Sequence, residues 1–383
     1  MNIRRAVEKI EISDIRKIAE KLQCYENTIN LTIGEPDLDL PQEIKEAVAY
    51  HALNSRINYS PVSGLPELKN KIAKFYNENF CNENYFNGDN VIVTVGSTEG
   101  IASSLQTILE NDDEVLIPTP AYVGYEPLIK MYGARPKFID LKENSFNLTG
   151  EILEKNISEK TKAIILTYPN NPSGMILDET EMKKIVELLK DREIFLISDE
   201  IYASIVFEKY TSFAKYYKEL KKQLIILNGF SKSHSMTGYR VGYVIVNEEL
   251  QAQIKKVSQY KIASASTLSQ YAAITALDKC QDISGFIEVF KERAKFFVAK
   301  LEEIGFKCLK PKGAFYIFAS YENIEKLKDK KSLDLALDLL DKVALGVVPG
   351  SSFKVEGYIR FSIVHDIPIL KETIERLEKY IKQ

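Results

Sequence analysis

Histidine and cysteine are scarce in this sequence, and the few that occur form no metal-binding pattern. The chain of 383 residues contains three histidines, and these make neither an HxxxH nor an HExxH motif. A structural metal site is therefore not expected, and a Ser-His-Asp triad has few candidate bases. The cysteines lie far apart without a CxxC pair, so neither a zinc knuckle nor a disulfide framework is indicated. They are Cys24, Cys81, Cys280 and Cys308.

Long apolar runs and a large excess of one charge are also missing. No apolar run approaches the roughly 20 residues that are needed to span a bilayer. The N-terminal segment is charged throughout and lacks the apolar core of a secretory signal peptide. The net charge of −3 gives no reason to expect nucleic acid or an anionic membrane as a partner. We therefore expect a cytoplasmic protein that acts on small molecules.

Short apolar runs alternate with amphipathic helical patterns through the middle of the chain. The stretch 179–190, for example, has its apolar residues at helical spacing. Repeated strand–helix–strand order predicts a mostly parallel α/β sheet. Seven runs supply the expected strands: 91–95, 114–117, 137–139, 163–167, 194–198, 224–227 and 241–246.

The length of the chain predicts two domains, because a single hydrophobic core seldom serves so many residues. We expect a large domain over residues 46–285, with the seven-stranded sheet sandwiched by helices. A smaller α+β domain is expected from residues 1–45 and 286–383. It would contain a helix near 13–22, apolar runs at 314–318 and 358–363, and a final amphipathic helix from about Pro368.

The residues that follow the apolar runs point to chemistry, because ligands of open parallel sheets bind outside the carboxyl ends of the strands. Gly96, Ser97 and Thr98 follow the first run and open a helix. Free N–H groups and the positive end of the helix dipole suit a phosphate at such a point. Taken alone, this segment is better explained as an ordinary N-cap.

Two further loops carry candidate cofactor contacts. Tyr122 ends the proline-stiffened segment 118–122 and could stack on a flat cofactor, although most of the 21 tyrosines will be surface or core residues. The segment YPNNPSG at 168–174 holds Asn171 between prolines. An amide there can hydrogen-bond a ring hydroxyl or a carboxylate.

An acid and a lysine complete the set. Asp199 ends an apolar strand, where desolvation calls for a cationic partner, and a helix cap or structural ion pair is the plain alternative. Lys232 lies among small residues eight positions before Arg240, and its plain alternative is a solvated surface lysine. Together the strand ends offer a lysine, a buried acid, a helix end, an aromatic ring and an arginine. Pyridoxal phosphate (PLP) requires this combination for its aldehyde, pyridine nitrogen, ring and phosphate.

The sequence resembles the class I aminotransferases, which are PLP enzymes of fold type I, along nearly its whole length. The likeness begins at LTIGEPD (31–37) and continues through YPNNPSG (168–174) and DEIY (199–202). It is strongest at SKSHSMTGYRVG (231–242) and ends at Arg360. The order and spacing of these motifs are highly specific. The resemblance implies an aspartate aminotransferase-like fold of the two-domain kind described above.

Three segments carry a closer likeness to one bacterial branch, that of the N-acetyl-L,L-diaminopimelate and aromatic aminotransferases. They are SKSHSMTG (231–238), QYKIASASTLSQ (259–270) and GAFYIF (313–318). The resemblance therefore implies an enzyme of amino acid biosynthesis, with lysine biosynthesis as one candidate pathway.

The resemblance also implies roles for individual residues toward the cofactor ring. Lys232 matches the lysine that holds PLP as a Schiff base, and Asp199 matches the acid that keeps the pyridine nitrogen protonated. Tyr202 and Asn171 match the pair that hydrogen-bonds the ring 3-hydroxyl. Tyr122 stands where the family places an aromatic ring stacked on the pyridine.

Further matches concern the phosphate of the cofactor. Arg240, Ser97 and Thr98 match phosphate ligands, and Gly96 and Ser231 belong to the same implied cofactor site. No metal ligand is implied.

Substrate binding and oligomeric state follow from two other matches. Arg360 matches the arginine that clamps the substrate α-carboxylate, assisted by Asn171 and the backbone of Gly34. Tyr59 matches a tyrosine that reaches the phosphate of the neighbouring subunit, which implies at least a homodimer with shared active sites.

The implied reaction moves an amino group from an L-amino acid to a 2-oxo acid, for which 2-oxoglutarate is expected, by a ping-pong mechanism. The Lys232 amine removes the Cα proton and must be neutral to do so, which predicts a lowered pKa. The expected donor is N-acetyl-L,L-diaminopimelate or an aromatic or aspartate-type amino acid. Tyr122 and Tyr125 could favour aromatic rings, and spacing names no second arginine that reads the substrate side chain.

Three other functions are alternatives to transamination. A PLP-dependent carbon–sulfur β-lyase shares most of the site residues, so the motifs do not exclude it. A non-catalytic regulator that fuses this fold to a DNA-binding module is disfavoured, because too few residues precede the first motif and the chain is acidic. A dinucleotide dehydrogenase is excluded, because no GxGxxG follows an expected strand.

Overall fold

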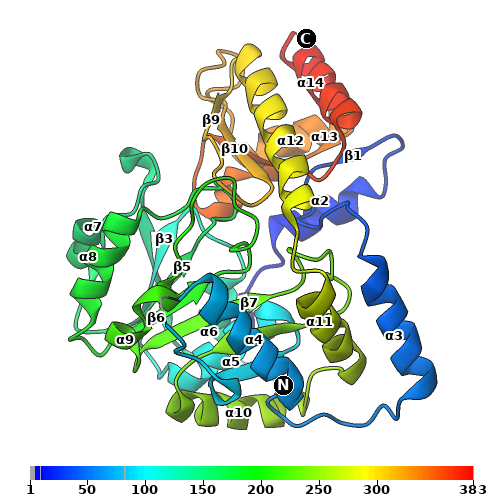
Figure 1. Ribbon diagram of the computed structural model, residues 1–383. Helices are drawn as coiled ribbons and strands as arrows, with labels where there is room; N and C mark the ends of the chain where they lie inside the picture. Colours follow the sequence, from blue (N-terminus) through cyan, green and yellow to red (C-terminus); the bar gives the residue numbers. More distant parts are fainter. Residues whose placement is uncertain (1–4, 9, 82, 383) are drawn as a thin grey trace.

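The computed structural model describes residues 5–8, 10–81 and 83–382. Its larger part is a twisted sheet with helices on both faces, and a smaller part with its own sheet lies above it in Figure 1. Within the described residues, no helix combines the length and the apolar character that crossing a membrane would require.

The large sheet has seven strands in the order β2-β8-β7-β6-β5-β3-β4. Strand β8 runs antiparallel to both of its neighbours, and the other pairs are parallel, so the expected mostly parallel sheet is confirmed. All seven expected strands are present. Their bounds are β2 (Val91–Thr94), β3 (Glu114–Thr119), β4 (Arg135–Asp140), β5 (Thr161–Thr167), β6 (Phe195–Asp199), β7 (Leu224–Gly229) and β8 (Gly242–Ile245).

Alternating side chains of the buried strands feed two separate cores, one on each face of the sheet. In β5, for example, Ile164 and Leu166 join one core, and Ala163 and Ile165 join the other. The first face is covered by α4 (Pro66–Asn79), α7 (Gly150–Asn156), α8 (Glu179–Leu189), α9 (Tyr217–Leu220) and α11 (Thr267–Lys279). The second face is covered by α5 (Gly96–Ile108), α6 (Tyr125–Met131) and α10 (Glu248–Ile262).

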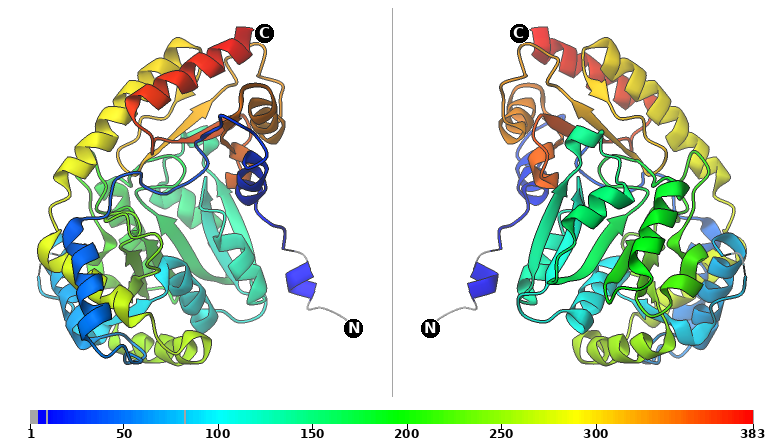
Figure 2. Two further views of the ribbon diagram at one scale, coloured as in Figure 1. Left: turned by 90° about the vertical axis from the view of Figure 1, so that its right-hand side faces the viewer. Right: turned by 90° about the vertical axis from the view of Figure 1, so that its left-hand side faces the viewer.

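The smaller part is built on a four-stranded antiparallel sheet in the order β12-β13-β10-β9. These strands are β9 (Lys307–Cys308), β10 (Tyr316–Ser320), β12 (Val348–Pro349) and β13 (Tyr358–Ser362). Figure 2 shows long helices covering this sheet. They are α12 (Ser284–Glu303) and α14 (Ile367–Lys382), with α13 (Ser332–Val343) nearby.

The N-terminal segment packs on the small part, as expected. Helix α2 (Asp14–Leu22) buries Ile18 and Leu22 in the core of that part. The short strand β1 (Ile29–Asn30) pairs in parallel with β11 (Leu345–Gly346). In Figure 2 this blue segment lies beside the orange C-terminal elements.

Apart from α3, the remaining elements are short. They are α1 (Arg5–Glu8), α3 (Gln42–Asn54), η1 (Gly88–Asn90), η2 (Lys142–Asn144), η3 (Phe213–Tyr216) and η4 (Gly350–Phe353). We propose that the chain forms two domains, one of residues 46–285 and one of residues 1–45 with 286–383, each built around its own sheet. Both boundaries of this proposal fall inside helices, α3 and α12, which connect the two parts.

Candidate active site

A cavity of about 530 Å³ opens at the carboxyl ends of β5, β6 and β7, within the usual size range of small-molecule sites. Eleven of the thirteen predicted site residues line it. They are Gly34, Ser97, Thr98, Tyr122, Asn171, Asp199, Tyr202, Ser231, Lys232, Arg240 and Arg360. The structure thus gathers residues from both ends and the middle of the chain around one space.

The amine of Lys232 lies in this cavity, on the loop that follows β7. Its Nζ atom donates a hydrogen bond to the carbonyl oxygen of Gly34 at 2.6 Å. Burial lowers the pKa of Lys232 to about 8, and the nearby guanidinium groups of Arg240 and Arg360 act in the same direction. The predicted lowering of this pKa is therefore present, and a neutral amine is accessible near physiological pH.

Asp199 is the last residue of β6 and only 4% exposed. Its Oδ2 atom accepts a hydrogen bond from the Tyr125 hydroxyl at 2.6 Å, and its Oδ1 atom accepts one from the Ile201 N–H at 3.3 Å. Burial raises the pKa of Asp199 to about 6, against the effect of the Tyr125 hydrogen bond. Among the described residues, no lysine or arginine forms an ion pair with this carboxylate. The buried acid therefore still has room for a cationic partner.

Tyr125, which together with Tyr122 could favour aromatic substrates, lines the cavity. Its side chain is 1% exposed, and its hydroxyl also lies 2.6 Å from the Thr167 Oγ1 atom. The hydroxyl of Tyr125 is thus engaged by Thr167 and Asp199, and it orients the Asp199 carboxylate. The contact between Tyr125 and Asp199 could not be predicted from the sequence, because no local pattern pairs residues that lie 74 positions apart.

The start of α5 and Arg240 form a cradle that excludes side chains. Gly96 has a φ of +73°, and a Cβ atom there would lie 2.6 Å from Nη2 of Arg240. The positive φ therefore favours glycine, and a Cβ atom would force the end of the Arg240 side chain to move. Ser97 and Thr98 follow in the first helical turn, where backbone N–H groups are free of helical partners. Positive charge and free donors make this the natural anion site of the cavity.

Arg360 approaches the cavity from β13 of the small part and is 2% exposed. Its Nη1 atom donates to Oδ1 of Asn171 at 3.1 Å, and Nη2 donates to the carbonyl oxygen of Thr32. The guanidinium carbon lies 4.5 Å from the ring centroid of Tyr316. Within the described residues Nε has no hydrogen-bond partner, so this buried cation retains donor capacity for an anion.

Tyr316 is a site residue that the sequence analysis did not identify. Its hydroxyl lies 2.7 Å from that of Tyr202, and its ring supports Arg360. A Cβ atom on Gly34 would come within 2.1 Å of the same hydroxyl, which explains why the loop requires glycine there. The motif GAFYIF contains Tyr316, but the motif alone does not tell which of its aromatic side chains faces the cavity.

The comparison with known proteins agrees with this geometry. The sequence profile of the family described as "Aminotransferase class I and II" matches residues 26–377. The chain belongs to this family.

Individual relatives cover nearly the whole chain. A probable N-acetyl-LL-diaminopimelate aminotransferase of Bacillus subtilis is 38% identical over 97% of this chain and 94% of its own length. An aspartate aminotransferase of the same organism is 34% identical, over 96% of this chain and 94% of its own. The crystal structure of an aspartate aminotransferase from Thermotoga maritima superimposes with a TM-score of 0.92 and 31% identity, covering 100% of both chains. The expected aspartate aminotransferase-like fold is confirmed.

Class I and II aminotransferases depend on PLP, and the residues of this aminotransferase suit that cofactor. A buried carboxylate without a cation, an amine of lowered pKa and a glycine-lined anion cradle are the groups that pyridinium, aldehyde and phosphate require. Within the described residues, no cluster of histidine, cysteine, aspartate and glutamate could hold a metal ion.

Tyr59 is the one predicted residue that the structure does not bring near this site. Its side chain is 90% exposed and lines no part of the cavity in its own chain. Other large apolar side chains are also strongly exposed nearby in the sequence, on α3 and after it. They are Tyr50 (61%), Leu53 (84%) and Ile57 (41%).

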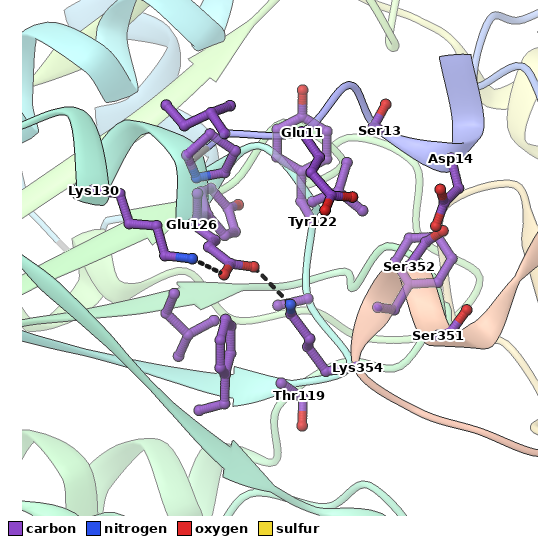
Figure 3. A pocket seen from close by; sticks show the side chains of 18 of the residues that line it. Glu11, Ser13, Asp14, Thr119, Tyr122, Glu126, Lys130, Ser351, Ser352 and Lys354 are labelled. Atoms are coloured by element: carbon purple, nitrogen blue, oxygen red, sulfur yellow. Dashed lines mark hydrogen bonds and ion pairs between the residues drawn. The ribbon is translucent and has the colours of Figure 1, made fainter. Parts of the chain in front are cut away.

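A second cavity of about 350 Å³ adjoins the first and shares Tyr122 and Tyr125 with it. Figure 3 shows Glu126 between two lysines, with Ser13 and Asp14 from the N-terminal segment on the opposite side. Glu126 binds Lys130 at 2.6 Å and Lys354 at 2.7 Å. The Glu126–Lys354 pair joins α6, which covers the large sheet, to the residue that directly follows η4.

Proposed function

We propose that this PLP-dependent aminotransferase transfers the amino group of a dicarboxylic or aromatic L-amino acid to 2-oxoglutarate. N-acetyl-L,L-diaminopimelate is the first candidate donor, followed by aspartate and the aromatic amino acids. The names of the relatives support this order, since the most similar of the two Bacillus proteins is described as acting on N-acetyl-LL-diaminopimelate. The same comparisons do not favour the β-lyase alternative.

The observation that carries the proposal is the meeting of Lys232, Asp199 and Arg360 in one cavity. PLP supplies, when bound, an electron-withdrawing ring that stabilises negative charge at the substrate Cα atom. We assign to Arg360 the binding of the α-carboxylate through its planar pair of N–H donors, which orients the Cα–H bond. The neutral Lys232 amine then takes the Cα proton on Nζ.

We assign the other residues to cofactor binding. Asp199 holds the protonated pyridine nitrogen, and Tyr122 stacks on the ring. Asn171 and Tyr202 hydrogen-bond the ring 3-hydroxyl, and Asn171 also steadies Arg360 at 3.1 Å. The phosphate is bound at the start of α5 and by the adjacent loop, through Gly96, Ser97, Thr98, Ser231 and Arg240.

We also propose that the enzyme is a homodimer in which Tyr59 reaches the phosphate bound to its partner. The exposure of Tyr59 and of Leu53 supports this, because exposed large apolar side chains gathered in one region mark an interface. Tyr260 of α10 is 88% exposed, and the Thr267 hydroxyl that follows α10 donates to the Asn58 carbonyl at 2.7 Å. These segments therefore belong to one surface region.

A location in the cytoplasm is the last part of the proposal. The four cysteines are free thiols, and Cys280 and Cys308 are buried. Unpaired cysteines fit a reducing compartment.

An amino-donor screen tests the function. The PLP-loaded protein is mixed with aspartate, glutamate, alanine, phenylalanine, tyrosine, N-acetyl-L,L-diaminopimelate and cystathionine, and conversion of PLP to pyridoxamine phosphate is followed by absorbance. Conversion by one donor, reversed by 2-oxoglutarate, would establish the reaction and name the donor. Pyruvate released from cystathionine, without conversion by any donor, would transfer the assignment to a lyase.

Lys232→Ala is the control for that screen. It is expected to lose both turnover and the visible absorption of lysine-bound PLP. Lys261→Ala serves as a comparison variant, because partial desolvation also lowers the pKa of Lys261, an exposed residue outside the cavity. It should retain both properties.

A further inference from the structure

Glu200 is a second buried acid beside Asp199, and the proposed reaction does not use it. Its side chain is fully buried, yet it lines no part of the cavity. It directly follows β6, and its backbone N–H donates to the carbonyl oxygen of Leu227 in β7 at 2.8 Å. Glu200 therefore lies at the end of the strand that carries Asp199, next to the site but outside it.

Four donors surround the Glu200 carboxylate. Ser198 donates to Oε1 at 2.8 Å, and Tyr76 donates to Oε2 at 3.2 Å. The Ser212 hydroxyl lies 2.8 and 2.7 Å from the two carboxylate oxygens, and the Phe213 N–H donates to Oε1 at 3.3 Å. These are three hydroxyls and one N–H group, with no lysine or arginine among them. Because a buried carboxylate needs such donors in place of water, it favours the one arrangement of the segments that supply them.

Two of these donors close a loop on the carboxylate. Residues 201–211, which we call the 201–211 loop, leave the sheet after Glu200, and the chain returns at Ser212, the residue before η3. Glu200 and Ser212 lie 12 positions apart in the sequence and are hydrogen-bonded at the base of this loop. Holding the two ends together removes much of the conformational freedom of the segment between them. Glu200 thus restricts the positions that the 201–211 loop can take.

The carboxylate is itself anchored to the sheet. Asn228 of β7 donates from Nδ2 to the Tyr76 hydroxyl at 2.8 Å, and Tyr76 in turn donates to Glu200. A hydrogen-bonded chain therefore connects the ends of β6 and β7 on the side of the sheet where Tyr76 is buried. The base of the 201–211 loop is fixed to these two strands.

The 201–211 loop carries Tyr202 and also contacts the small part. The Phe207 N–H donates to the carbonyl oxygen of Lys312 at 2.8 Å. The Tyr202 hydroxyl lies 2.7 Å from that of Tyr316. A shift of the loop would therefore move Tyr202 relative to both the cavity and the small part.

We propose that Glu200 is a positioning residue of the active site, which closes the 201–211 loop and thereby holds Tyr202 where it can hydrogen-bond the 3-oxygen of bound PLP. This inference rests on the proposed function, which assigns Tyr202 to that oxygen. A hydroxyl donor there stabilises the negative charge that remains on the ring oxygen when lysine-bound PLP loses its Schiff-base proton. Displacement of Tyr202 should therefore raise the pH at which that proton is lost.

Two serine variants test the loop closure with the same chemical change. Ser212→Ala and Ser198→Ala each remove one buried hydroxyl that donates to Oε1 of Glu200 at 2.8 Å. Ser212 lies across the loop from Glu200, whereas Ser198 lies in β6, two residues before it. Because the Ser212 hydroxyl also accepts a hydrogen bond from the Ala214 N–H of η3, Glu200→Gln is a third variant that keeps this helix cap.

The first measurement follows the visible absorption of lysine-bound PLP as the pH is varied. Glu200→Gln and Ser212→Ala are expected to raise the midpoint by about 0.5 to 1 pH unit, the size of a weakened hydrogen bond to a charged group. Ser198→Ala should keep the wild-type midpoint. Wild-type midpoints in both loop variants would overturn the proposal, even if urea unfolding showed both to be less stable. An equal shift in Ser198→Ala would overturn it as well.

Hydrogen exchange tests the loop in the protein freed of PLP, so the result does not depend on the cofactor. The N–H groups of Ile205 and Phe207 are hydrogen-bonded to the carbonyl oxygens of Tyr202 and Lys312. Both should exchange at least about tenfold faster in the two loop variants than in the wild type or the control serine variant. Wild-type exchange rates in the loop variants would overturn the proposal. If Glu200→Gln fails to fold, Ser212→Ala decides by the same two measurements.

Tyr202→Phe separates a failure of this inference from a failure of the proposed function. It should raise the midpoint at least as far as the loop variants do. A wild type that binds no PLP, or an unshifted midpoint in Tyr202→Phe, would contradict the roles assigned under the proposed function. Faster exchange in Glu200→Gln and Ser212→Ala would then still support the closure of the loop by Glu200.

Discussion

The Tyr125 hydroxyl donates a hydrogen bond to the buried carboxylate of Asp199 at 2.6 Å. Tyr125 opens α6 on one face of the sheet, and Asp199 ends the central strand β6. Because the donor is fixed by its own burial and by Thr167, the carboxylate cannot rotate freely. The other carboxylate oxygen accepts a hydrogen bond from the Ile201 N–H. The two hydrogen bonds position the carboxylate to bind a cation in the cavity.

Replacement of this acid should abolish most turnover. Asp199→Asn is expected to keep the fold and lower kcat by roughly a hundredfold or more, because an amide cannot stabilise a pyridinium as a carboxylate does. Tyr125→Phe, which keeps the carboxylate and removes one hydrogen bond, should lower kcat much less. Steady-state kinetics with circular dichroism as a fold check measures both. Near-normal kcat in Asp199→Asn would remove Asp199 from the cofactor role.

The lowered pKa of Lys232 predicts the pH at which its amine becomes reactive. A base whose pKa is lowered loses its proton at lower pH, so half of the amine should be neutral at about pH 8 in the protein freed of PLP. The modification rate by an amine-directed reagent, followed by peptide mass spectrometry at this lysine, should rise to half its maximum near that pH. A midpoint near the value of an ordinary lysine, about 10.4, would contradict the burial argument.

A largely buried ion pair joins helix α12 to the segment that follows Gly34. Arg293 of α12 is 6% exposed and binds Asp37 through both of its terminal nitrogens, at 2.6 and 2.8 Å. Asp37 follows the Gly34 loop that contacts Lys232. Arg293→Ala should lower the free energy of unfolding by about 2–3 kcal/mol, because it leaves a partly buried carboxylate unpaired.

Urea unfolding of that variant is compared with Lys190→Ala, which breaks an exposed pair with Glu187. The exposed pair should leave the urea midpoint nearly unchanged, because solvent screens it. Equal effects of the two substitutions would show that the Arg293–Asp37 pair stabilises the fold no more than an exposed ion pair does.

The proposed dimer makes a prediction at Leu53. Its side chain is 84% exposed, so Leu53→Lys should leave the chain folded while placing a charge in the proposed interface. Size-exclusion chromatography with light scattering should show a dimer for the wild type and a shift to monomer in the variant, with weaker PLP retention. Glu325→Lys, at a site whose side chain is 88% exposed on the small part, adds two units of positive charge away from the proposed interface and should remain dimeric. A fully active wild-type monomer would contradict the proposal that Tyr59 reaches the phosphate bound to the partner subunit.

Local sequence patterns were enough to predict much of the fold and most of the residues proposed to bind the cofactor. Short apolar runs mark the seven strands, and the chemistry of a parallel sheet gathers at the carboxyl ends of its strands. Lys232, Asp199 and Asn171 follow such strands directly, so their positions in the sequence already placed them on one edge. The motifs at 168–174 and 231–242 then identified the family.

The sequence by itself thus determined the order of the strands along the chain, the residues at their ends and the class of cofactor, because these depend on periodicity and short motifs. Only the tertiary structure decided that Tyr125 holds Asp199 and that Tyr316 fills the space beside Gly34. Each of these contacts joins residues far apart in the chain. They arise from packing between separate elements, which no local pattern encodes.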